Sequence, residues 1–321
     1  MNPSKSADKP LWKPGPGAIA SARISAFIEL VNERHGTKIA GYEALYAWSI
    51  GNLEAFWAAM WDFGGVIAEK RGERILVDGD RMPGARFFPD ARLNFAENLL
   101  RVRGDGDALA FWGEDKVKRR LSHGELRALV SRTQQALAAA GVREGDRVAA
   151  FMPNMPETLV AMLASASLGA TFTSCSPDFG VQGVLDRFGQ VEPKVLFCCD
   201  GYFYNGKTID TLPRIAQIME GLPTVKQVVV VPYVSPRPDA SLVPRASRLD
   251  EFLAPYEARE IEFRRLPFNH PLYILYSSGT TGVPKCIVHG AGGVLLQHLK
   301  EHMLLADVRP GDRLFYFTTC G

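Results

Sequence analysis

The sequence has 321 residues, of which 46% are hydrophobic and 22% are charged, and its formal net charge is +2. These values are ordinary for a globular protein with a large core, and they give no reason to expect binding to nucleic acid or to an anionic membrane. No apolar run approaches membrane-spanning length, and residues 1–17 lack the apolar centre of a signal peptide.

The five cysteines predict the redox compartment of the protein. They are odd in number and lie on apolar stretches without C-x-x-C spacing, so we expect buried, reduced thiols and a cytoplasmic protein. Cys198 and Cys199 are adjacent and should point to opposite faces of a strand, which makes them a poor pair of metal ligands.

The N-terminal part of the chain is predicted to be helical. Residues 1–17 are polar and rich in proline, which is typical of a disordered leader. Apolar residues recur at helical spacing in 18–35, with Gly36 as the stop. Residues 41–63 are dense in aromatic side chains, a pattern that marks helix-packing core more often than a ligand pocket. We interpret 18–95 as a helical N-terminal extension.

From about residue 110 the chain alternates between strand and helix patterns. Ser122 and Glu125 form a capping-box pattern that opens a helix ending before Gly141. Further helices are expected at 156–168, 181–190, 209–220 and from 290, and strands at 147–152, 170–174, 194–199, 227–231, 272–276, 286–289 and 312–319. This alternation predicts an α/β fold with mostly parallel sheets and helices on both faces.

Residues 276–285 read Tyr-Ser-Ser-Gly-Thr-Thr-Gly-Val-Pro-Lys and lie between two apolar runs. This composition suits a phosphate group. Glycine permits positive φ, so successive backbone N–H groups can converge on an anion. The hydroxyl groups add donors and Lys285 adds a positive charge. A Ser/Thr/Gly-rich hairpin turn without a ligand is the alternative.

The same string resembles the phosphate-loop signature of the adenylate-forming enzymes, the superfamily of acyl-CoA synthetases, luciferases and peptide-synthetase adenylation domains. It does not resemble a Walker loop, because a strand is expected to follow it. The resemblance implies catalytic contacts for Thr280 and Lys285. It assigns the ATP phosphates to Ser277, Ser278, Gly279, Thr280, Thr281, Gly282 and Lys285.

Strings at 152–157, 174–189 and 289–302 look like acetoacetyl-CoA synthetases, with acetyl-CoA synthetases as the near alternative. Residues 88–99 resemble a segment found in both groups. The resemblance implies an acid–thiol ligase that uses ATP, Mg²⁺ and coenzyme A. Acetoacetate would attack ATP to give an acyl-adenylate and pyrophosphate, and the thiol of coenzyme A would then displace AMP.

The resemblance covers the chain from about residue 40 to its end and corresponds to roughly the first half of a family member. We therefore expect 96–321 to be the N-terminal part of the large adenylate-forming domain. The acyl pocket, the adenine, ribose and Mg²⁺ contacts and the C-terminal lid domain are expected beyond Gly321, so the chain alone should be inactive.

Residues 201–208 match the Walker pattern G-x-x-x-x-G-K-[ST], which makes a P-loop NTPase the distant alternative. Acetyl-CoA synthetases carry a basic, glycine-containing contact for coenzyme A at this place, beginning with arginine. Here Tyr204 and Asn205 replace the arginine, whereas Gly206 and Lys207 remain. A coenzyme A contact and a plain surface turn both stay open for this stretch.

Two histidines could suggest a metal site. His298 and His302 form the pattern H-x-x-E-H, which could place two ligands on one helix face. The pattern is short and follows the expected phosphate loop, so we attribute it to chance and assign no metal ligand. His289 is expected to be a structural histidine.

Overall fold

The computed structural model describes residues 11–277 and 282–320. These residues form two compact units. One unit holds the described residues up to Val66 together with Leu296–Phe315, and the other holds Ile67–Leu295 together with the residues from Tyr316 onward. The predicted division near residue 95 stays a prediction. No helix in the described part of the chain has both the length and the apolar content needed to cross a membrane.

The first unit is helical. It contains α1 (Pro16–Ser21), α2 (Arg23–His35), α3 (Tyr42–Gly51), α4 (Leu53–Phe63), the C-terminal part of α11 (Ala291–Lys300) and the π-helical turn η2 (Glu301–Leu305). Phe27 is buried, and its ring centre lies 5.8 Å from that of Phe56 and 5.3 Å from that of Phe63, both edge to face. The prediction that aromatic residues in 41–63 form core is thus confirmed for Phe56, although Tyr46 is 52% exposed.

The second unit is built on a seven-stranded sheet with the order β13-β12-β9-β7-β8-β15-β16. All neighbouring strands are parallel except β15 and β16, so the predicted mostly parallel sheet is confirmed. The strands are β7 (Arg147–Phe151), β8 (Thr171–Cys175), β9 (Val195–Cys199), β12 (Gln227–Val231), β13 (Ala246–Arg248), β15 (Pro271–Tyr276) and β16 (Cys286–Gly290).

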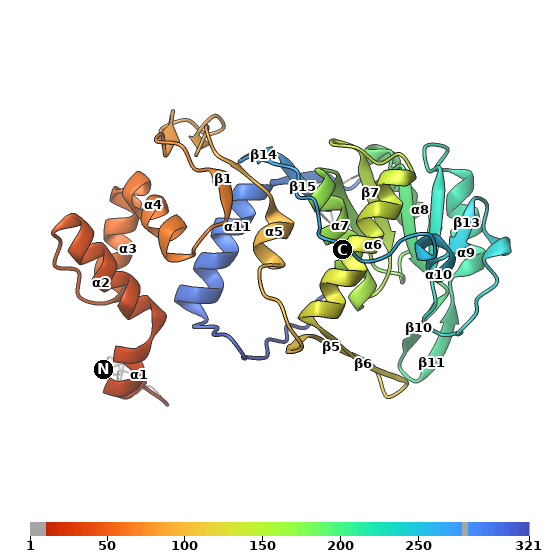
Figure 1. The fold of residues 1–321 in the computed structure, drawn as a ribbon, viewed down its shortest axis with the longest axis horizontal. Coiled ribbons are helices and arrows are strands. Elements are labelled where there is room, and N and C mark those ends of the chain that lie inside the picture. Colours follow the sequence, from red (N-terminus) through yellow and green to blue (C-terminus); the bar gives the residue numbers. More distant parts are fainter. Residues whose placement is uncertain (1–10, 278–281, 321) are drawn as a thin grey trace, which may run out of the picture. The chain divides into compact units, whose positions relative to one another are not determined.

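Helices α7 (Pro156–Leu168), α8 (Val181–Val191), α9 (Leu212–Glu220) and α10 (Leu249–Leu253) lie between successive strands of the sheet in the chain (Figure 1). Helices α5 (Phe95–Leu99) and α6 (His123–Ala139) precede β7 and pack on α7. The capping box of α6 forms as predicted, with the Glu125 amide donating to the Ser122 hydroxyl at 3.1 Å.

Alternation along β9 shows that both faces of the sheet are covered. Leu196 and Cys198 lie in a buried cluster with residues of α8 and α9. Phe197 points the opposite way, and its ring lies 6.3 Å from that of Phe252 in α10. Helix α10 packs beside α6, which in turn packs along α7. The expected separation of the Cys198 and Cys199 side chains follows from the same alternation.

Four smaller pairings complete the second unit. Strands β1 (Ala68–Lys70), β4 (Arg92–Leu93) and β14 (Leu266–Pro267) form a three-stranded sheet. The other three are two-stranded sheets. They join β2 (Leu76–Val77) with β3 (Arg86–Phe87), β5 (Asp107–Gly113) with β6 (Val117–Ser122), and β10 (Gly201–Tyr204) with β11 (Lys207–Asp210).

The loop expected at 232–246 is confirmed up to residue 245, with a 3-10 turn at Ala240–Leu242, and Ala246 begins β13. Three other predictions were wrong. The extension expected to be helical over 18–95 contains β1, β2, β3 and β4 after its last helix, α4. The helix expected from residue 209 begins at Leu212, because the preceding residues pair as β11. The strand expected at 312–319 is absent, and Phe317 is 92% exposed. An apolar segment becomes a strand only where a neighbouring strand meets its N–H and C=O groups.

Candidate functional site

The stretch predicted to bind phosphate connects the two antiparallel strands β15 and β16. Tyr276 and Cys286 are the last paired residues of this ladder, and the Ser277 amide donates to the Lys285 carbonyl oxygen at 3.1 Å. The two sides of the connection therefore meet at its base. Gly282 has a φ of +90°, the positive value that the sequence led us to expect of a loop glycine. A strand follows the connection, as predicted, so this is not a Walker loop.

Four of the predicted phosphate-binding residues, Ser278, Gly279, Thr280 and Thr281, lie outside the described residues. The other three lie at the two ends of the connection. Pro284 is buried, whereas Lys285 is exposed and has no ion-pair partner among the residues that the structure describes. An exposed ammonium group at the base of this connection is free to meet an anion.

Tyr276 anchors the first side of the connection. Its phenol oxygen lies 2.8 Å from the Thr173 hydroxyl, which also donates to the Ile274 carbonyl oxygen at 2.9 Å. Burial raises the pKa of the Tyr276 phenol above its ordinary value, so the group keeps its proton and can donate it in a hydrogen bond. The sequence pointed to neither contact, because the pairing of β8 with β15 brings Thr173 beside Ile274 across a separation of 101 residues.

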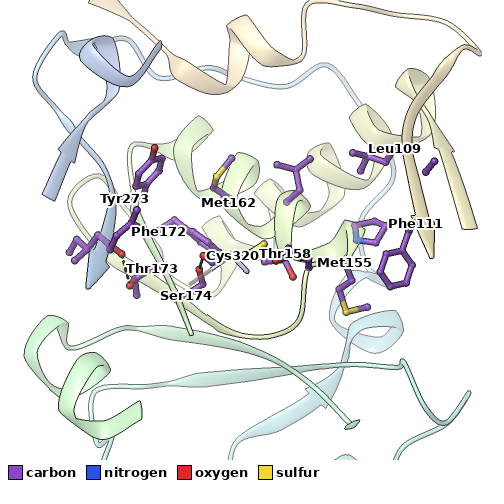
Figure 2. Close-up of a pocket in the computed structure, with 16 residues that line it drawn as sticks. Leu109, Phe111, Met155, Thr158, Met162, Phe172, Thr173, Ser174, Tyr273 and Cys320 are labelled. Carbon is purple, nitrogen blue, oxygen red and sulfur yellow. Dashed lines mark hydrogen bonds between the residues drawn. The ribbon is translucent and has the colours of Figure 1, made fainter. Parts of the chain in front are cut away.

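A cavity lies next to these strands, and Figure 2 shows the residues that line it. Its volume is about 420 Å³. Its lining includes Thr173 and Tyr273 from the sheet, Met162 from α7 and Phe111 from β5. The lining is mostly apolar, with a few hydroxyl groups. Thr173 therefore contributes both to the cavity wall and to the anchor of Tyr276.

The carboxyl ends of β7 and β8 form a second feature beside the cavity. The chain leaves β7 for α7 and leaves β8 for α8, and these helices lie on opposite faces of the sheet. Such a switch point is the usual ligand crevice of an open parallel sheet. The side chains of Asn154 and Ser174 donate there to the carbonyl oxygens of Thr318 and Cys320.

The stretch 201–208 forms the tight hairpin β10–β11. Asn205 and Gly206 occupy the turn with φ values of +50° and +74°, the conformation typical of an Asn-Gly hairpin turn. A Walker loop runs from a strand into a helix, so the P-loop alternative is wrong for these residues. Lys207 is exposed, and the Gly206 amide donates to the Glu114 carboxylate at 3.1 Å. This hairpin belongs to a separate two-stranded sheet.

We searched the described residues for groups of side chains that could bind a metal ion. In the ranges 11–277 and 282–320, no three or more His, Cys, Asp and Glu side chains are grouped closely enough to hold one. The rings of His298 and His302 lie 6.1 Å apart and belong to no such group of three within these ranges. The described residues therefore supply no three-ligand site for Mg²⁺.

The cysteines are only partly as predicted. Cys175, Cys198 and Cys199 are buried, and burial raises the pKa of each thiol. Cys286 is partly exposed and Cys320 is exposed, so the expectation that all thiols are buried was wrong. Cys286 follows Lys285 at the start of an edge strand, where only one neighbouring strand covers it.

Comparison with known proteins assigns this arrangement to a family. The model for AMP-binding enzymes matches residues 99–320, and the model for the acetyl-coenzyme A synthetase N-terminus matches residues 42–99. The chain therefore belongs to the AMP-binding enzyme family. The adjoining family matches meet near residue 99.

Individual members of the family show which enzymes the chain is most readily compared with. The chain is 57% identical to an acetoacetyl-coenzyme A synthetase of Rhizobium meliloti (strain 1021), over 98% of this chain and 48% of that protein. It is 42% identical to a malonamoyl-CoA synthetase of Penicillium aethiopicum, over 97% of this chain and 44% of that protein. The structure of an acetoacetyl-CoA synthetase from Streptomyces lividans matches with a TM-score of 0.91 and 42% identity, over 97% of this chain and 48% of that chain. The chain thus spans about half the length of these relatives.

Proposed function

We propose that this chain is the N-terminal part of an ATP-dependent acid–thiol ligase that converts acetoacetate and coenzyme A to acetoacetyl-CoA, releasing AMP and pyrophosphate. The observation that carries the proposal is the β15–β16 connection. It is closed at its base by the bond from Ser277 to Lys285 and presents an exposed ammonium group beside hydroxyl-rich sequence. The identity of 57% to an acetoacetyl-coenzyme A synthetase supports the choice of substrate.

The proposed chemistry explains why such a connection is needed. A carboxylate is a poor acyl electrophile, and transfer of AMP to it supplies a good leaving group. Negative charge builds on the departing pyrophosphate, so hydrogen-bond donors must already be in place for it. We assign this role to Lys285 and Thr280 as catalytic contacts. The remaining phosphate-binding residues are Ser277, Ser278, Gly279, Thr281 and Gly282.

The acyl group is the finer part of the proposal. Acetoacetyl and malonamoyl, the groups named for two similar relatives, both carry a carbonyl on the carbon next to the α-carbon. Acetyl does not, and it is the alternative that the match at residues 42–99 supports. We therefore propose a 3-oxo acid or a similar 3-carbonyl acid as substrate, with acetoacetate first.

We also propose a coenzyme A contact at the β10–β11 turn. Lys207 is exposed there and can meet a phosphate of the cofactor as a point charge. Gly206 is fixed by its bond to Glu114, which holds the turn in one place. An N-terminal extension at 18–95, helical only as far as Phe63, completes the proposed organisation together with the large-domain part at 96–321 and a lid domain in the full-length protein.

The test uses the full-length protein with ATP, Mg²⁺, coenzyme A and, in parallel, acetoacetate, malonamate or acetate. We expect AMP and pyrophosphate as products and the highest kcat/KM with acetoacetate. Formation of ADP without AMP would contradict adenylation. A higher kcat/KM for acetate would transfer the assignment to the acetyl-CoA synthetases.

A further inference from the structure

Helix α8 contacts the chain on both sides of residues 278–281. On the β15 side, the Arg187 guanidinium lies 5.8 Å from the centre of the Tyr276 ring. On the β16 side, the Gln190 side-chain amide donates to the Pro284 carbonyl oxygen at 2.9 Å. Arg187 and Gln190 are three residues apart, so they lie on one face of the helix.

The helix itself is a firm base for these contacts. Val184 and Phe188 are buried in the core cluster between the helix and the sheet, and Val191 is also buried. Residues on the adjoining face of α8 are therefore held in position relative to the strands. A side chain projecting from such a face loses less freedom when it makes a contact than one on a mobile loop.

Arg187 is held by two further contacts. Its guanidinium donates to the Gly183 carbonyl oxygen at 2.7 Å and lies 4.3 Å from the centre of the Phe179 ring. A Cβ at Gly183 would come within 3.2 Å of the Phe179 ring and 3.7 Å of the guanidinium. Glycine at this position thus leaves room for the arginine to lie over the ring, where a planar cation is attracted to the aromatic face.

We propose that Arg187 and Gln190 are positioning residues that hold the two ends of the phosphate-binding connection during adenylation. Arg187 fixes Tyr276 and Gln190 fixes Pro284, so that the bond from Ser277 to Lys285 closes between them. This inference rests on the proposed function, since it requires that the connection holds ATP. Small displacements of a positioned charge are costly, because reaction rates depend steeply on geometry.

The first test measures the contact without any catalysis. Hydrogen exchange of the Ser277 amide is followed in the ligand-free full-length protein, because this amide closes the connection. In Gln190→Ala we expect exchange about three- to tenfold faster, the effect of losing one hydrogen bond. The matched control is Gln182→Ala on the same helix. The Gln182 side-chain amide donates to the Asp186 carboxylate at 2.6 Å, so its loss should leave the exchange unchanged.

The second test separates positioning from general destabilisation. Arg187→Met and Arg187→Lys are assayed for ATP–pyrophosphate exchange and for thioester formation from preformed acyl-adenylate. We expect the exchange to slow about tenfold or more in both variants, because lysine cannot replace the planar guanidinium over a ring. Thioester formation from the preformed adenylate should change less than twofold, since pyrophosphate has already left.

Equal slowing of both half-reactions in the Arg187 variants would overturn the proposal. An unchanged hydrogen-exchange rate of the Ser277 amide in Gln190→Ala would overturn it as well. Full recovery by Arg187→Lys would also contradict it, because charge alone would then suffice. If the unmodified protein exchanges no pyrophosphate into ATP, the proposed function fails. The Ser277 measurement would still decide whether α8 holds the connection.

Discussion

The amide of Ser277 donates to the carbonyl oxygen of Lys285 at 3.1 Å, one step beyond the last paired residues of β15 and β16. This bond fixes where the backbone of Lys285 lies relative to the start of the connection. The Lys285 side chain, in contrast, is exposed. A fixed backbone with a free ammonium group suits a lysine that meets phosphate groups only when ATP is bound.

Lys285→Ala should therefore slow the first half-reaction more than the second. The lysine would face phosphates that leave as pyrophosphate, so its loss removes a contact that strengthens in the transition state. We expect a loss of about 2–4 kcal/mol, a 30- to 1,000-fold fall in ATP–pyrophosphate exchange. The measurement compares this exchange with thioester formation from preformed acyl-adenylate in the full-length protein.

Lys38→Ala serves as the control for this variant, because Lys38 is another exposed lysine and lies in the helical unit. It should behave like the unmodified protein in both assays. If Lys285→Ala slows both half-reactions by the same factor, the lysine has a structural role only.

Lys207→Ala tests the hairpin instead. If the exposed lysine meets a phosphate of coenzyme A, its loss should raise the KM for coenzyme A about three- to tenfold and leave kcat nearly unchanged. ATP–pyrophosphate exchange should not change. Lys226→Ala is the control, since Lys226 is exposed just before the amino end of β12, away from the carboxyl ends of the strands.

Two outcomes would count against the coenzyme A contact. No change in the KM for coenzyme A would leave the hairpin as a plain surface turn. Loss of pyrophosphate exchange in Lys207→Ala, together with an active Lys285→Ala, would show that the hairpin binds ATP. That result would contradict the assignment of the ATP phosphates to the β15–β16 connection.

Much of the fold could be predicted because its signals are local. The Ser122 capping box, the left-handed residue Gly169 after α7 and the apolar strands of the sheet all depend on neighbouring residues. The flanks of the phosphate-binding stretch are also local, so β15 and β16 were placed to within a residue or two.

The errors and omissions arise where distant parts of the chain decide the outcome. The contact of Thr173 with Tyr276 and that of Gln190 with Pro284 join residues 103 and 94 positions apart. The apolar pattern at 312–319 could not reveal whether a neighbouring strand pairs with it. The hairpin at 201–210 was a missed local signal, because the Walker pattern obscured Asn205-Gly206, a common turn pair.

Asn94 gives a test of stability in the segment at 88–99. It is fully buried, and its amide donates to the carbonyl oxygens of Ala166 at 3.0 Å and Arg264 at 2.9 Å. Its side-chain oxygen caps α5 by accepting from the Ala96 amide at 2.9 Å. Asn94→Ala leaves buried groups without partners, so the free energy of unfolding should fall by about 2–4 kcal/mol.

Urea unfolding measures this change, and Asn52→Ala is the matched control. Asn52 is exposed and its side-chain amide donates to the Trp48 carbonyl oxygen at 3.0 Å, so its variant should stay within about 0.5 kcal/mol of the unmodified protein. Similar losses in the two variants would show that the buried bonds of Asn94 contribute little.

The buried thiol of Cys199 predicts how stability depends on pH. Burial raises its pKa to about 12, whereas a thiol in an unfolded chain titrates near about 8.5. Between these values the unfolded chain has lost the proton and the folded chain has kept it, so the free energy of unfolding falls as pH rises. The contribution is fully present below about pH 8.5 and is lost as pH approaches 12.

Urea unfolding at pH 7, 8.5 and 10 checks this dependence in the unmodified protein and in Cys199→Ala. The variant removes the titrating group, so its stability should fall less steeply between pH 8.5 and 10, whatever its stability at pH 7. Burial also raises the pKa of Cys175 to about 12. Because Cys175 remains in both proteins, it contributes the same fall of stability with pH to each. Parallel curves for the two proteins would contradict the prediction, because the Cys199 thiol would then titrate alike in the folded and unfolded chains.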